Sequence, residues 1–157
     1  EEADLPGVRD SKDLSAPRRE ECFWHILAAA RAVSIACVEP SGIARMNILG
    51  ATLAAMTAAV SGLSLPPDLV LIDGPYHLPI PFAQSGIPRG DARSLSIAAA
   101  SIVAKVHRDA LMTAYDALYP GYGFARHKGY GTEDHLAALR LFGPCPIHRL
   151  GFRGVTV

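Results

Sequence analysis

The sequence predicts an α/β fold, for two reasons. Short apolar runs with β-branched residues alternate with longer segments in which apolar residues recur every three or four positions. Their order along the chain is helix–strand–helix–strand–helix, which is typical of α/β proteins. The chain has 157 residues, of which 50% are hydrophobic and 19% charged, so it is not a disordered tail. We expect a single domain over residues 1–157.

The first half of the chain predicts a helix, a strand and a second helix. Ser15 is a candidate N-cap, and Pro17 lies in the first turn, where its missing N–H costs least, so we expect a helix over 17–31. The apolar, β-branched run 32–38 predicts a strand that ends at a Pro-Ser-Gly sequence. Apolar residues at three- and four-residue steps predict an amphipathic helix over 43–60.

The second half predicts one more strand and two more helices. A short apolar run between turn signals predicts a buried strand within 68–74. Several prolines and glycines indicate a loop over 75–92, and an alanine-rich stretch without Pro or Gly predicts a long helix over 94–119. Four glycines indicate a loop over 120–131. A capping threonine then begins a short helix over 132–142, which Gly and Pro end.

Charge, hydropathy and cysteine content exclude some functions. Fifteen basic and fifteen acidic residues cancel, which argues against binding nucleic acid by bulk electrostatics but leaves room for a local basic groove. No continuous apolar run reaches the ~18 residues of a membrane span. The opening residues 1–4 show no export signal, although one removed from the chain is not excluded. Cys22, Cys37 and Cys145 are odd in number and widely spaced, so we expect a reducing, cytoplasmic location.

Two aspartates are candidates for catalysis or metal binding. Asp73 directly follows an apolar strand, and ligand sites of α/β sheets lie at the carboxyl ends of strands. A local turn with Gly74 explains it equally well. Asp91 precedes the long helix, where helix capping is at least as good an explanation. Carboxylates on adjacent loops suit Mg²⁺, and two metals can clamp a phosphodiester, but two carboxylates are too few for two metals.

Two further segments carry polar side chains of interest. Residues 119–131 mix aromatic, glycine and basic residues, a combination that suits phosphate contact and stacking but also an ordinary glycine-rich loop. Cys145 and His148 are soft ligands, with His127 and His135 upstream. Only one cysteine is near them, which argues against a structural zinc site.

Several segments together resemble bacterial ribonuclease HII, the type 2 ribonuclease H. The matching segments occur in the order and spacing of that family and cover nearly the whole chain. They are GVRDSKDLS at 7–15, LIDG at 71–74, RGD at 89–91, SIAAASIVAKVHRD at 96–109, YPGYGFARHKGYGT at 119–132 and GPCPIHR at 143–149. No segment suffices alone, but the set is highly specific.

The resemblance implies a fold and an activity. The fold is a ribonuclease H-like mixed sheet flanked by helices. The activity is that of an endonuclease acting on RNA–DNA hybrids and on duplex DNA with embedded ribonucleotides. It cuts on the 5′ side of the ribonucleotide and leaves a 3′-hydroxyl and a 5′-phosphate. Four carboxylates with Mg²⁺ or Mn²⁺ form the family's active site. We expect a monomer without a membrane partner.

The resemblance also assigns roles to individual residues. Asp73 and Asp91 match two of the family's four carboxylates, and Tyr130 matches the tyrosine that stacks at the junction between ribonucleotide and deoxyribonucleotide. Lys12 matches a lysine that contacts the nucleic-acid backbone. Weaker candidates for substrate contact fall in matching motifs, namely Ser11, Ser94, His127 and Lys128. Arg9 stands where the family often has Asn, so that contact is expected to differ.

The chain departs from the family at its N-terminal end. Family members begin with a strand bearing an Asp-Glu pair and a Gly-Arg-Gly turn, and nothing in residues 1–15 matches it. We therefore expect an α/β domain without that strand and without two of the four carboxylates. One alternative is a catalytically impaired chain that only binds nucleic acid. Another is a structural domain that has lost its site.

Overall fold

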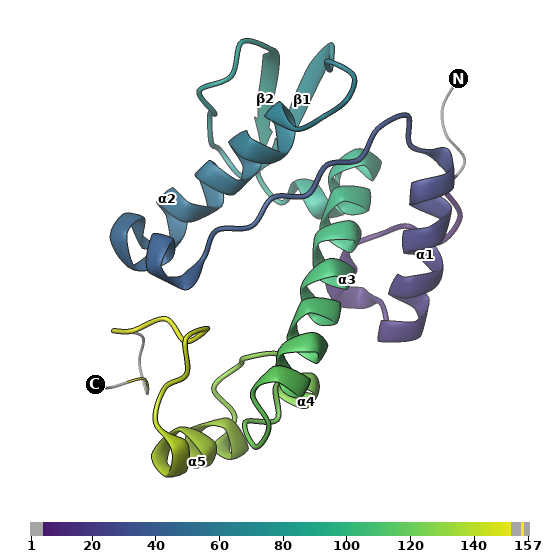
Figure 1. Ribbon diagram of the computed structural model, residues 1–157. Coiled ribbons are helices and arrows are strands. Elements are labelled where there is room, and N and C mark those ends of the chain that lie inside the picture. Colours follow the sequence, from purple (N-terminus) through teal and green to yellow (C-terminus); the bar gives the residue numbers. More distant parts are fainter. Residues whose placement is uncertain (1–4, 152–154, 156–157) are drawn as a thin grey trace. The chain divides into compact units, whose positions relative to one another are not determined.

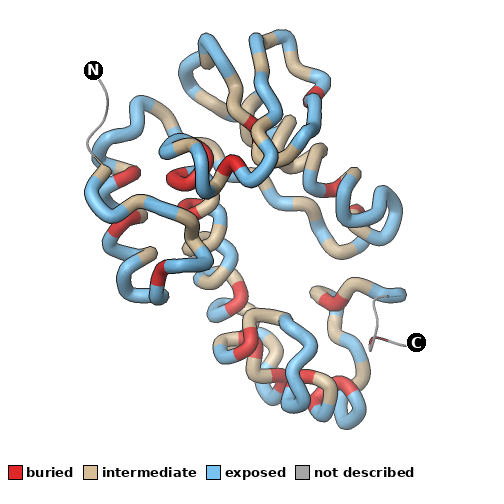
Figure 2. Tube along the Cα trace, turned by 180° about the vertical axis from the view of Figure 1, so that it is seen from behind, coloured by how far each residue is buried: buried red, intermediate tan, exposed pale blue. Residues whose placement is uncertain are grey.

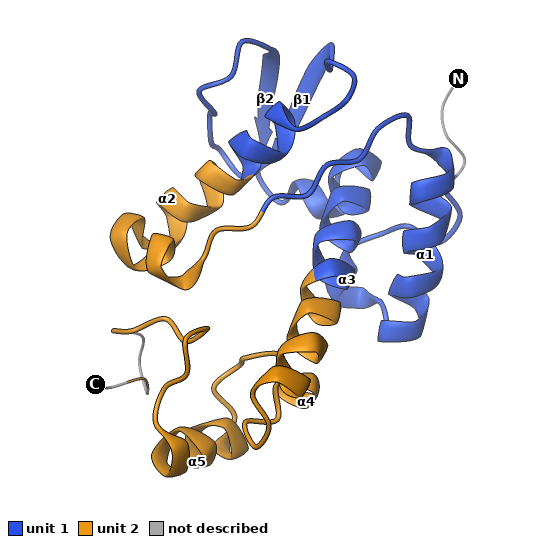
Figure 3. Cartoon of the chain, in the orientation of Figure 1, with its two compact units in different colours: residues 1–36, 56–107 blue, residues 37–55, 108–157 orange. Residues whose placement is uncertain are grey.

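The computed structural model describes residues 5–151 and 155, so the opening residues 1–4 lie outside it. The chain divides into two compact units (Figures 1 and 3). Unit 1 comprises residues 1–36 and 56–107, and unit 2 comprises residues 37–55 and 108–157. The prediction of a single domain over 1–157 stays a prediction.

The helices of unit 1 match the predicted ones closely. Helix α1 (Ala16–Ala29) follows Ser15, and α3 (Leu95–Leu118) begins in unit 1 and continues into unit 2. Side chains of α1 and α3 contribute to one buried core, and Figure 2 colours the buried positions along the Cα trace red. The buried core of unit 1 consists of Leu14, Cys22, Ile26, Ala99, Ile102 and Val103.

The sheet among the described residues has two parallel strands. Strand β1 (Leu69–Asp73) pairs with β2 (Ala83–Ile87), so that Asp73 lies opposite Ile87. The prediction of a strand within 68–74 is confirmed, although only Ile72 of β1 is buried. The prediction of a loop throughout 75–92 is wrong, because β2 lies inside it. Its sequence AQSGI has little intrinsic strand preference, so pairing with β1 determines its conformation.

The predicted strand over 32–38 is not formed. The segment is coil, although its residues alternate between exposed and partly buried, as those of a strand do. Val33 and Ile35 are 41% and 42% exposed. A strand requires a neighbouring chain with which it exchanges backbone hydrogen bonds, and no described segment pairs with this one. The segment therefore has the β-branched composition of a strand, but it forms no backbone hydrogen-bond ladder with another described segment.

Helix α2 (Pro40–Ser61) confirms and extends the predicted helix over 43–60. It is kinked at Asn47, whose backbone is not helical (φ 62°, ψ 176°). By length and composition α2 would suffice to cross a membrane, with an 18-residue window of mean hydropathy 1.4. The prediction from the sequence considered only continuous apolar runs and therefore did not identify this helix. Its apolar residues are interrupted by isolated polar ones such as Arg45. One such helix is weak evidence for a membrane protein, because the criterion rests on length and composition alone.

Unit 2 is built on the end of α3 and two further helices. Helix α4 (Phe124–His127) forms a single turn inside the predicted loop 120–131, and α5 (Glu133–Phe142) matches the predicted helix over 132–142. The Thr132 hydroxyl accepts a hydrogen bond from the His135 amide, as expected of an N-cap. The buried core of unit 2 consists of Met112, Tyr122, Phe124, Ala138, Leu139 and Val155.

Gly90, which is buried, leaves no room for a side chain. A Cβ at this position would overlap Ile97 Cδ1 and lie 3.4 Å from Asp73 Oδ1. Ile97 is buried and β-branched, so it has little freedom to move aside. We expect Gly90→Ala to lower the free energy of unfolding of unit 1 by about 1–3 kcal/mol, measured by chemical denaturation. Gly131→Ala is the control, because a Cβ there meets nothing within 4 Å; an equal loss in both variants would contradict the prediction.

Candidate functional site

Asp73 is held by the segment that follows β2. The residue ends β1, and its Oδ1 accepts a hydrogen bond of 2.8 Å from the Gly90 amide, 17 positions later in the chain. The side chain therefore does more than form a local turn with Gly74. It joins the carboxyl end of β1 to the turn that carries the second candidate aspartate. This is the end of a parallel pair at which α/β proteins place their ligands.

Asp91 lies next to this contact, in the short 3-10 helix η2 (Gly90–Ala92). One carboxylate oxygen, Oδ1, accepts from the Ala92 amide at 3.1 Å, and the other, Oδ2, accepts from Lys12 Nζ at 2.8 Å. Capping of α3 is instead performed by Ser94, whose hydroxyl accepts from the Ile97 amide at 3.4 Å. Asp91 therefore does not cap α3. Its Oδ2 instead faces Lys12 Nζ.

Lys12 and Asp10 complete this group of charges. They lie at the 3-10 helix η1 (Ser11–Asp13), where Asp10 Oδ1 accepts from the Lys12 amide at 3.0 Å. Lys12 Nζ lies 3.9 Å from Asp10 Oδ2 and points to Asp91. Ser11 lies between them, and its carbonyl accepts from Arg19 Nη1 at 3.0 Å. Asp10 was not among the predicted site residues, although the Asp-Ser-Lys pattern of a side-chain-capped turn was a signal for it.

The two charged groups stabilise one another's ionised forms. The hydrogen bond from Lys12 lowers the pKa of the Asp91 carboxyl, and the bond to Asp91 raises the pKa of the Lys12 ammonium, with further contributions from Asp10 and Asp73. The Lys12 side chain is 77% exposed and that of Asp91 is 11% exposed. Because water screens the exposed lysine, the pair orients the aspartate more than it stabilises the fold.

Lys12→Met is expected to raise the pKa of Asp91. A lowered pKa of a carboxyl in the folded protein adds stability above its ordinary value of ~3.9, and this stability is lost as the pH falls through the lowered pKa. Any stability difference between wild type and Lys12→Met should therefore be present at neutral pH and vanish in acid. An NMR titration of the side-chain carboxyl carbons measures the pKa. Lys12→Arg keeps the charge and serves as the control; an unchanged Asp91 titration in Lys12→Met would refute the assignment.

The donor chemistry of this group fits part of a divalent-cation site. Asp73 and Asp91 offer carboxylate oxygens at neighbouring positions, and hard cations such as Mg²⁺ prefer oxygen ligands. Within residues 5–151, however, no group of three or more His, Cys, Asp or Glu side chains is placed to hold a metal ion. The described residues thus provide two carboxylate ligands and do not by themselves assemble a two-metal centre.

The other predicted substrate residues belong to unit 2. Tyr130 is 63% exposed, and its backbone amide donates to the His127 carbonyl at 2.9 Å. Lys128 has a left-handed backbone (φ 52°), and its ammonium donates to Thr113 Oγ1 at 2.9 Å. His127 is buried, and both of its ring nitrogens bond to backbone groups of its own loop. Of the residues of unit 2 that were predicted to contact the substrate, Tyr130 is therefore the exposed one.

The chain is similar to many ribonucleases along almost its entire length. A family model described as Ribonuclease HII matches residues 2–155. A Ribonuclease HII of Syntrophobacter fumaroxidans is 66% identical over 151 residues, which are 96% of this chain and 65% of that protein. A Ribonuclease HII of Geobacter sulfurreducens is 56% identical over 97% of this chain and 70% of that protein. The chain thus spans about two thirds of the length of these relatives.

The fold agrees with a solved structure as well. The crystal structure of the ribonuclease H2 from Pyrococcus horikoshii OT3 matches 91% of this chain and 75% of that chain, with a TM-score of 0.75 and 22% sequence identity. At this identity the match bears on the fold alone, and it confirms the predicted ribonuclease H-like α/β class. The family match over 2–155 and the two relatives confirm the resemblance seen in the sequence. The chain belongs to the ribonuclease HII family.

Proposed function

We propose that this protein is an endoribonuclease that cleaves the RNA strand of RNA–DNA hybrids and cuts duplex DNA at embedded ribonucleotides, leaving a 3′-hydroxyl and a 5′-phosphate. The main support is the contact of Asp73 with the turn that carries Asp91, in a chain that matches the family over residues 2–155. The chain spans 65% of the length of the Syntrophobacter relative, so this is a proposal about the whole protein.

The two aspartates would hold the divalent cation that the family uses, Mg²⁺ or Mn²⁺. A bound cation of this kind activates water and stabilises charge on the phosphate. In our proposal Asp73 would bind the cation on the side of the attacking water. Asp91 would bind the cation on the side of the leaving oxygen. The other two carboxylates would come from the Asp-Glu segment of the family, which residues 1–15 do not match. Gly90 contributes by fixing Asp73 through its amide.

The remaining predicted residues would contact the nucleic acid. Tyr130 is proposed to pack against the deoxyribose that follows the ribonucleotide, which its outward placement permits. Lys12 is proposed to contact the backbone, and the weaker candidates Ser11, His127 and Lys128 stay predictions. Discrimination of RNA from DNA requires recognition of the 2′-hydroxyl. For the compartment we propose the cytoplasm, because the three cysteines are odd in number and widely spaced in the sequence.

The experiment is a cleavage assay on matched duplexes. One 5′-labelled DNA duplex carries a single ribonucleotide, and its control is all DNA; both are incubated with Mg²⁺, Mn²⁺ or EDTA. The 157-residue chain is compared with a chain extended N-terminally by the family's Asp-Glu and Gly-Arg-Gly segment. We expect metal-dependent cutting 5′ of the ribonucleotide by the extended chain, with product ends that a ligase and a polymerase identify. Cutting of the all-DNA duplex at the same rate would overturn the proposal.

For the 157-residue chain alone we expect weak or no cleavage, because two carboxylates bind two cations poorly. The described residues support this expectation, since they contain no group of three metal-binding side chains. The same chain should still bind the duplex in a salt-dependent way, as a nucleic-acid-binding module would. Cleavage by the isolated chain at the rate of the extended chain would refute the expectation.

A further inference from the structure

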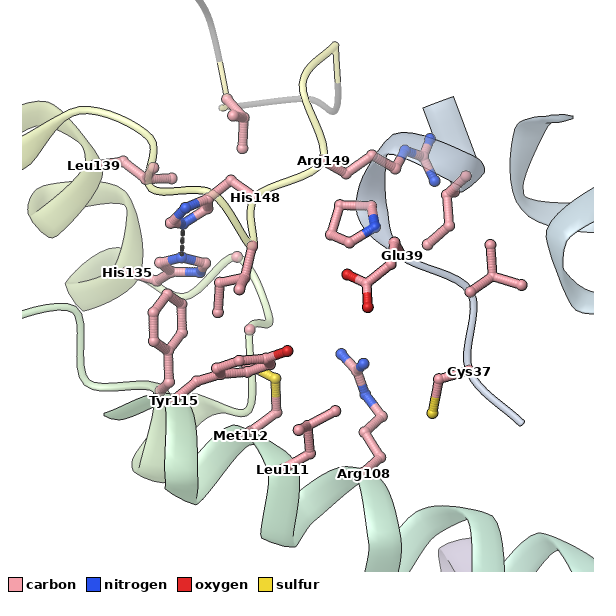
Figure 4. Close-up of a pocket in the computed structure, with 18 of the residues that line it drawn as sticks. Cys37, Glu39, Arg108, Leu111, Met112, Tyr115, His135, Leu139, His148 and Arg149 are labelled. Carbon is pink, nitrogen blue, oxygen red and sulfur yellow. Dashed lines mark hydrogen bonds between the residues drawn. The ribbon is translucent and has the colours of Figure 1, made fainter. Parts of the chain in front are cut away.

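Three buried histidines form one cluster in unit 2, in which two rings share a hydrogen bond and the third stacks on one of them. His127, His135 and His148 are only 6%, 5% and 8% exposed. The rings of His127 and His135 stack with centroids 4.3 Å apart and planes 14° apart. His135 Nε2 and His148 Nε2 face each other at 3.0 Å, the bond drawn in Figure 4. Two imidazole nitrogens at this distance need one proton between them, so the cluster has a defined direction of donation.

The partners at the two ends of the pair fix that direction. The Cys145 amide donates to His148 Nδ1 at 2.9 Å, so this nitrogen carries no proton and Nε2 of the neutral ring does. The Cys145 carbonyl at 3.2 Å from the same nitrogen is then not its acceptor. At the other end, His135 Nδ1 lies 2.9 Å from the Tyr130 carbonyl, which can only accept. His148 Nε2–H therefore donates to His135 Nε2, and His135 Nδ1–H donates to Tyr130.

The end of this chain of hydrogen bonds is the backbone of the exposed tyrosine. The Tyr130 carbonyl accepts from His135 Nδ1 and from the Thr132 amide at 2.8 Å, and its amide donates to the His127 carbonyl at 2.9 Å. His127 is itself fixed, because Nδ1 accepts from the Gly129 amide at 3.1 Å and Nε2 donates to the Tyr122 carbonyl at 2.7 Å. The Tyr130 carbonyl thus bonds to the ring of His135, and the Tyr130 amide bonds to the backbone of His127.

We propose that His135 is a positioning residue for Tyr130, whose carbonyl it holds through Nδ1–H in a tautomer set by His148. The inference rests on the proposed function in so far as Tyr130 contacts the substrate. Such a residue matters because an aromatic ring that is 63% exposed has few side-chain neighbours to orient it. A backbone held on both sides reduces the conformational freedom lost when the ring packs against a nucleotide.

The arrangement requires that the pair stays uncharged, since a second proton would place two donors against each other. Burial lowers the pKa of His135 and that of His148, which keeps both rings neutral at pH 7. The titratable groups nearest the pair are the stacked His127, Cys145 Sγ at 3.1 Å from His148 Nδ1, and Tyr122. Burial raises the pKa of Cys145, so its thiol stays protonated and brings no negative charge to the pair.

The pair also borders a cavity of about 240 Å³ within unit 2 (Figure 4). The charged groups that line this cavity are Glu39, Arg108 and Arg149, and Tyr115 also borders it. Because the folded pKa of each ring is lowered, the neutral pair adds stability above the ordinary histidine value of ~6.5, and this stability is lost as the pH falls below it. Protection of the Tyr130 amide should fall in the same pH range.

The first test is structural and does not depend on activity. Nitrogen-15 shifts of the histidine rings in the full 157-residue chain should show a proton on Nδ1 of His135 and on Nε2 of His148. Amide exchange then compares two matched variants. His135→Asn keeps an N–H donor near the Nδ1 position. His135→Phe keeps an aromatic ring but has no nitrogen that could donate or accept a hydrogen bond. We expect Tyr130 exchange about 3- to 10-fold faster in His135→Phe than in wild type, with rescue in His135→Asn.

The pH profile separates positioning from a general loss of structure. Tyr130 protection should fall below about pH 6.5 in wild type and in the control His25→Asn, which removes an exposed histidine of α1. In His135→Asn, which cannot take up this proton, the decline should be smaller. The opposite tautomers, or Tyr130 exchange that is equal in all variants, would overturn the proposal.

The second test measures binding to the duplex with one ribonucleotide at pH 7.5. We expect Tyr130→Ala to weaken binding, His135→Phe to weaken it by a smaller factor, and His135→Asn to restore it. If Tyr130→Ala binds like wild type, the proposed role of Tyr130 in substrate contact fails, while the exchange data still decide the positioning. If Tyr130→Ala weakens binding and His135→Phe does not, the positioning proposal fails and the proposed function stands.

Discussion

Asp73→Asn is expected to reduce metal-dependent cleavage by the N-terminally extended chain by more than about 100-fold. Even residues that only support a metal ligand cost ~10–100-fold when they are replaced, and Asp73 is proposed to be a ligand itself. The substitution removes one negative charge but keeps an oxygen at the position of Oδ1, so the bond from the Gly90 amide is retained. Single-turnover cleavage of the duplex with one ribonucleotide measures the effect.

The control for this prediction is Asp68→Asn, which removes the same charge from an exposed residue just before β1. It should cleave like the wild type. Thermal unfolding of Asp73→Asn should stay close to that of the wild type, because the backbone contact survives. Metal-dependent cutting that persists in Asp73→Asn would show that the metal is held elsewhere.

Phe124→Ala is expected to have the largest effect on stability, a loss of about 3–5 kcal/mol in unit 2. Phe124 is 1% exposed, and its ring stacks on Tyr122 with centroids 5.2 Å apart and planes 7° apart. Its edge contacts include His127 and His135 at 5.8 and 5.6 Å. Removing the ring leaves a cavity under the histidine cluster. A loss of this size is a large part of the 5–15 kcal/mol that typically stabilises a domain.

Hydrogen exchange resolves where this loss occurs. Amides of α5 should lose protection in Phe124→Ala, whereas Leu141→Ala, at a residue that is 74% exposed, should leave them unchanged. The single tryptophan, Trp24 on α1, reports separately on unit 1. If amides of α5 keep wild-type protection in Phe124→Ala, the aromatic core does not carry the stability of unit 2.

Local sequence patterns predicted the helices well. Ser15, Thr132 and the Gly-Pro after Phe142 mark the helix ends in the sequence, and the structure places α1 and α5 accordingly. Thr132 caps α5 through its side chain, whereas Ser15 occupies the N-cap position of α1 without a side-chain hydrogen bond. These signals act within a few residues of each other. The strands were harder to predict, because β1 and β2 depend on a neighbour. The run 32–38 has the composition of a strand but finds no partner among the described residues, whereas AQSGI becomes one by pairing with β1.

The sequence by itself determined the family, the helices, and Asp73 and Asp91 as candidate ligands, because these rest on residue type and short-range spacing. Only the tertiary structure decided that Lys12 Nζ and Asp10 belong with Asp91, and that His148 and His135 connect to the Tyr130 backbone. Cys145 and His148 read in the sequence as soft ligands near His127 and His135; in the structure they form hydrogen bonds. The physical reason is that a hydrogen bond depends on distance and direction between atoms, and for residues far apart in the chain the packing of the folded backbone sets both.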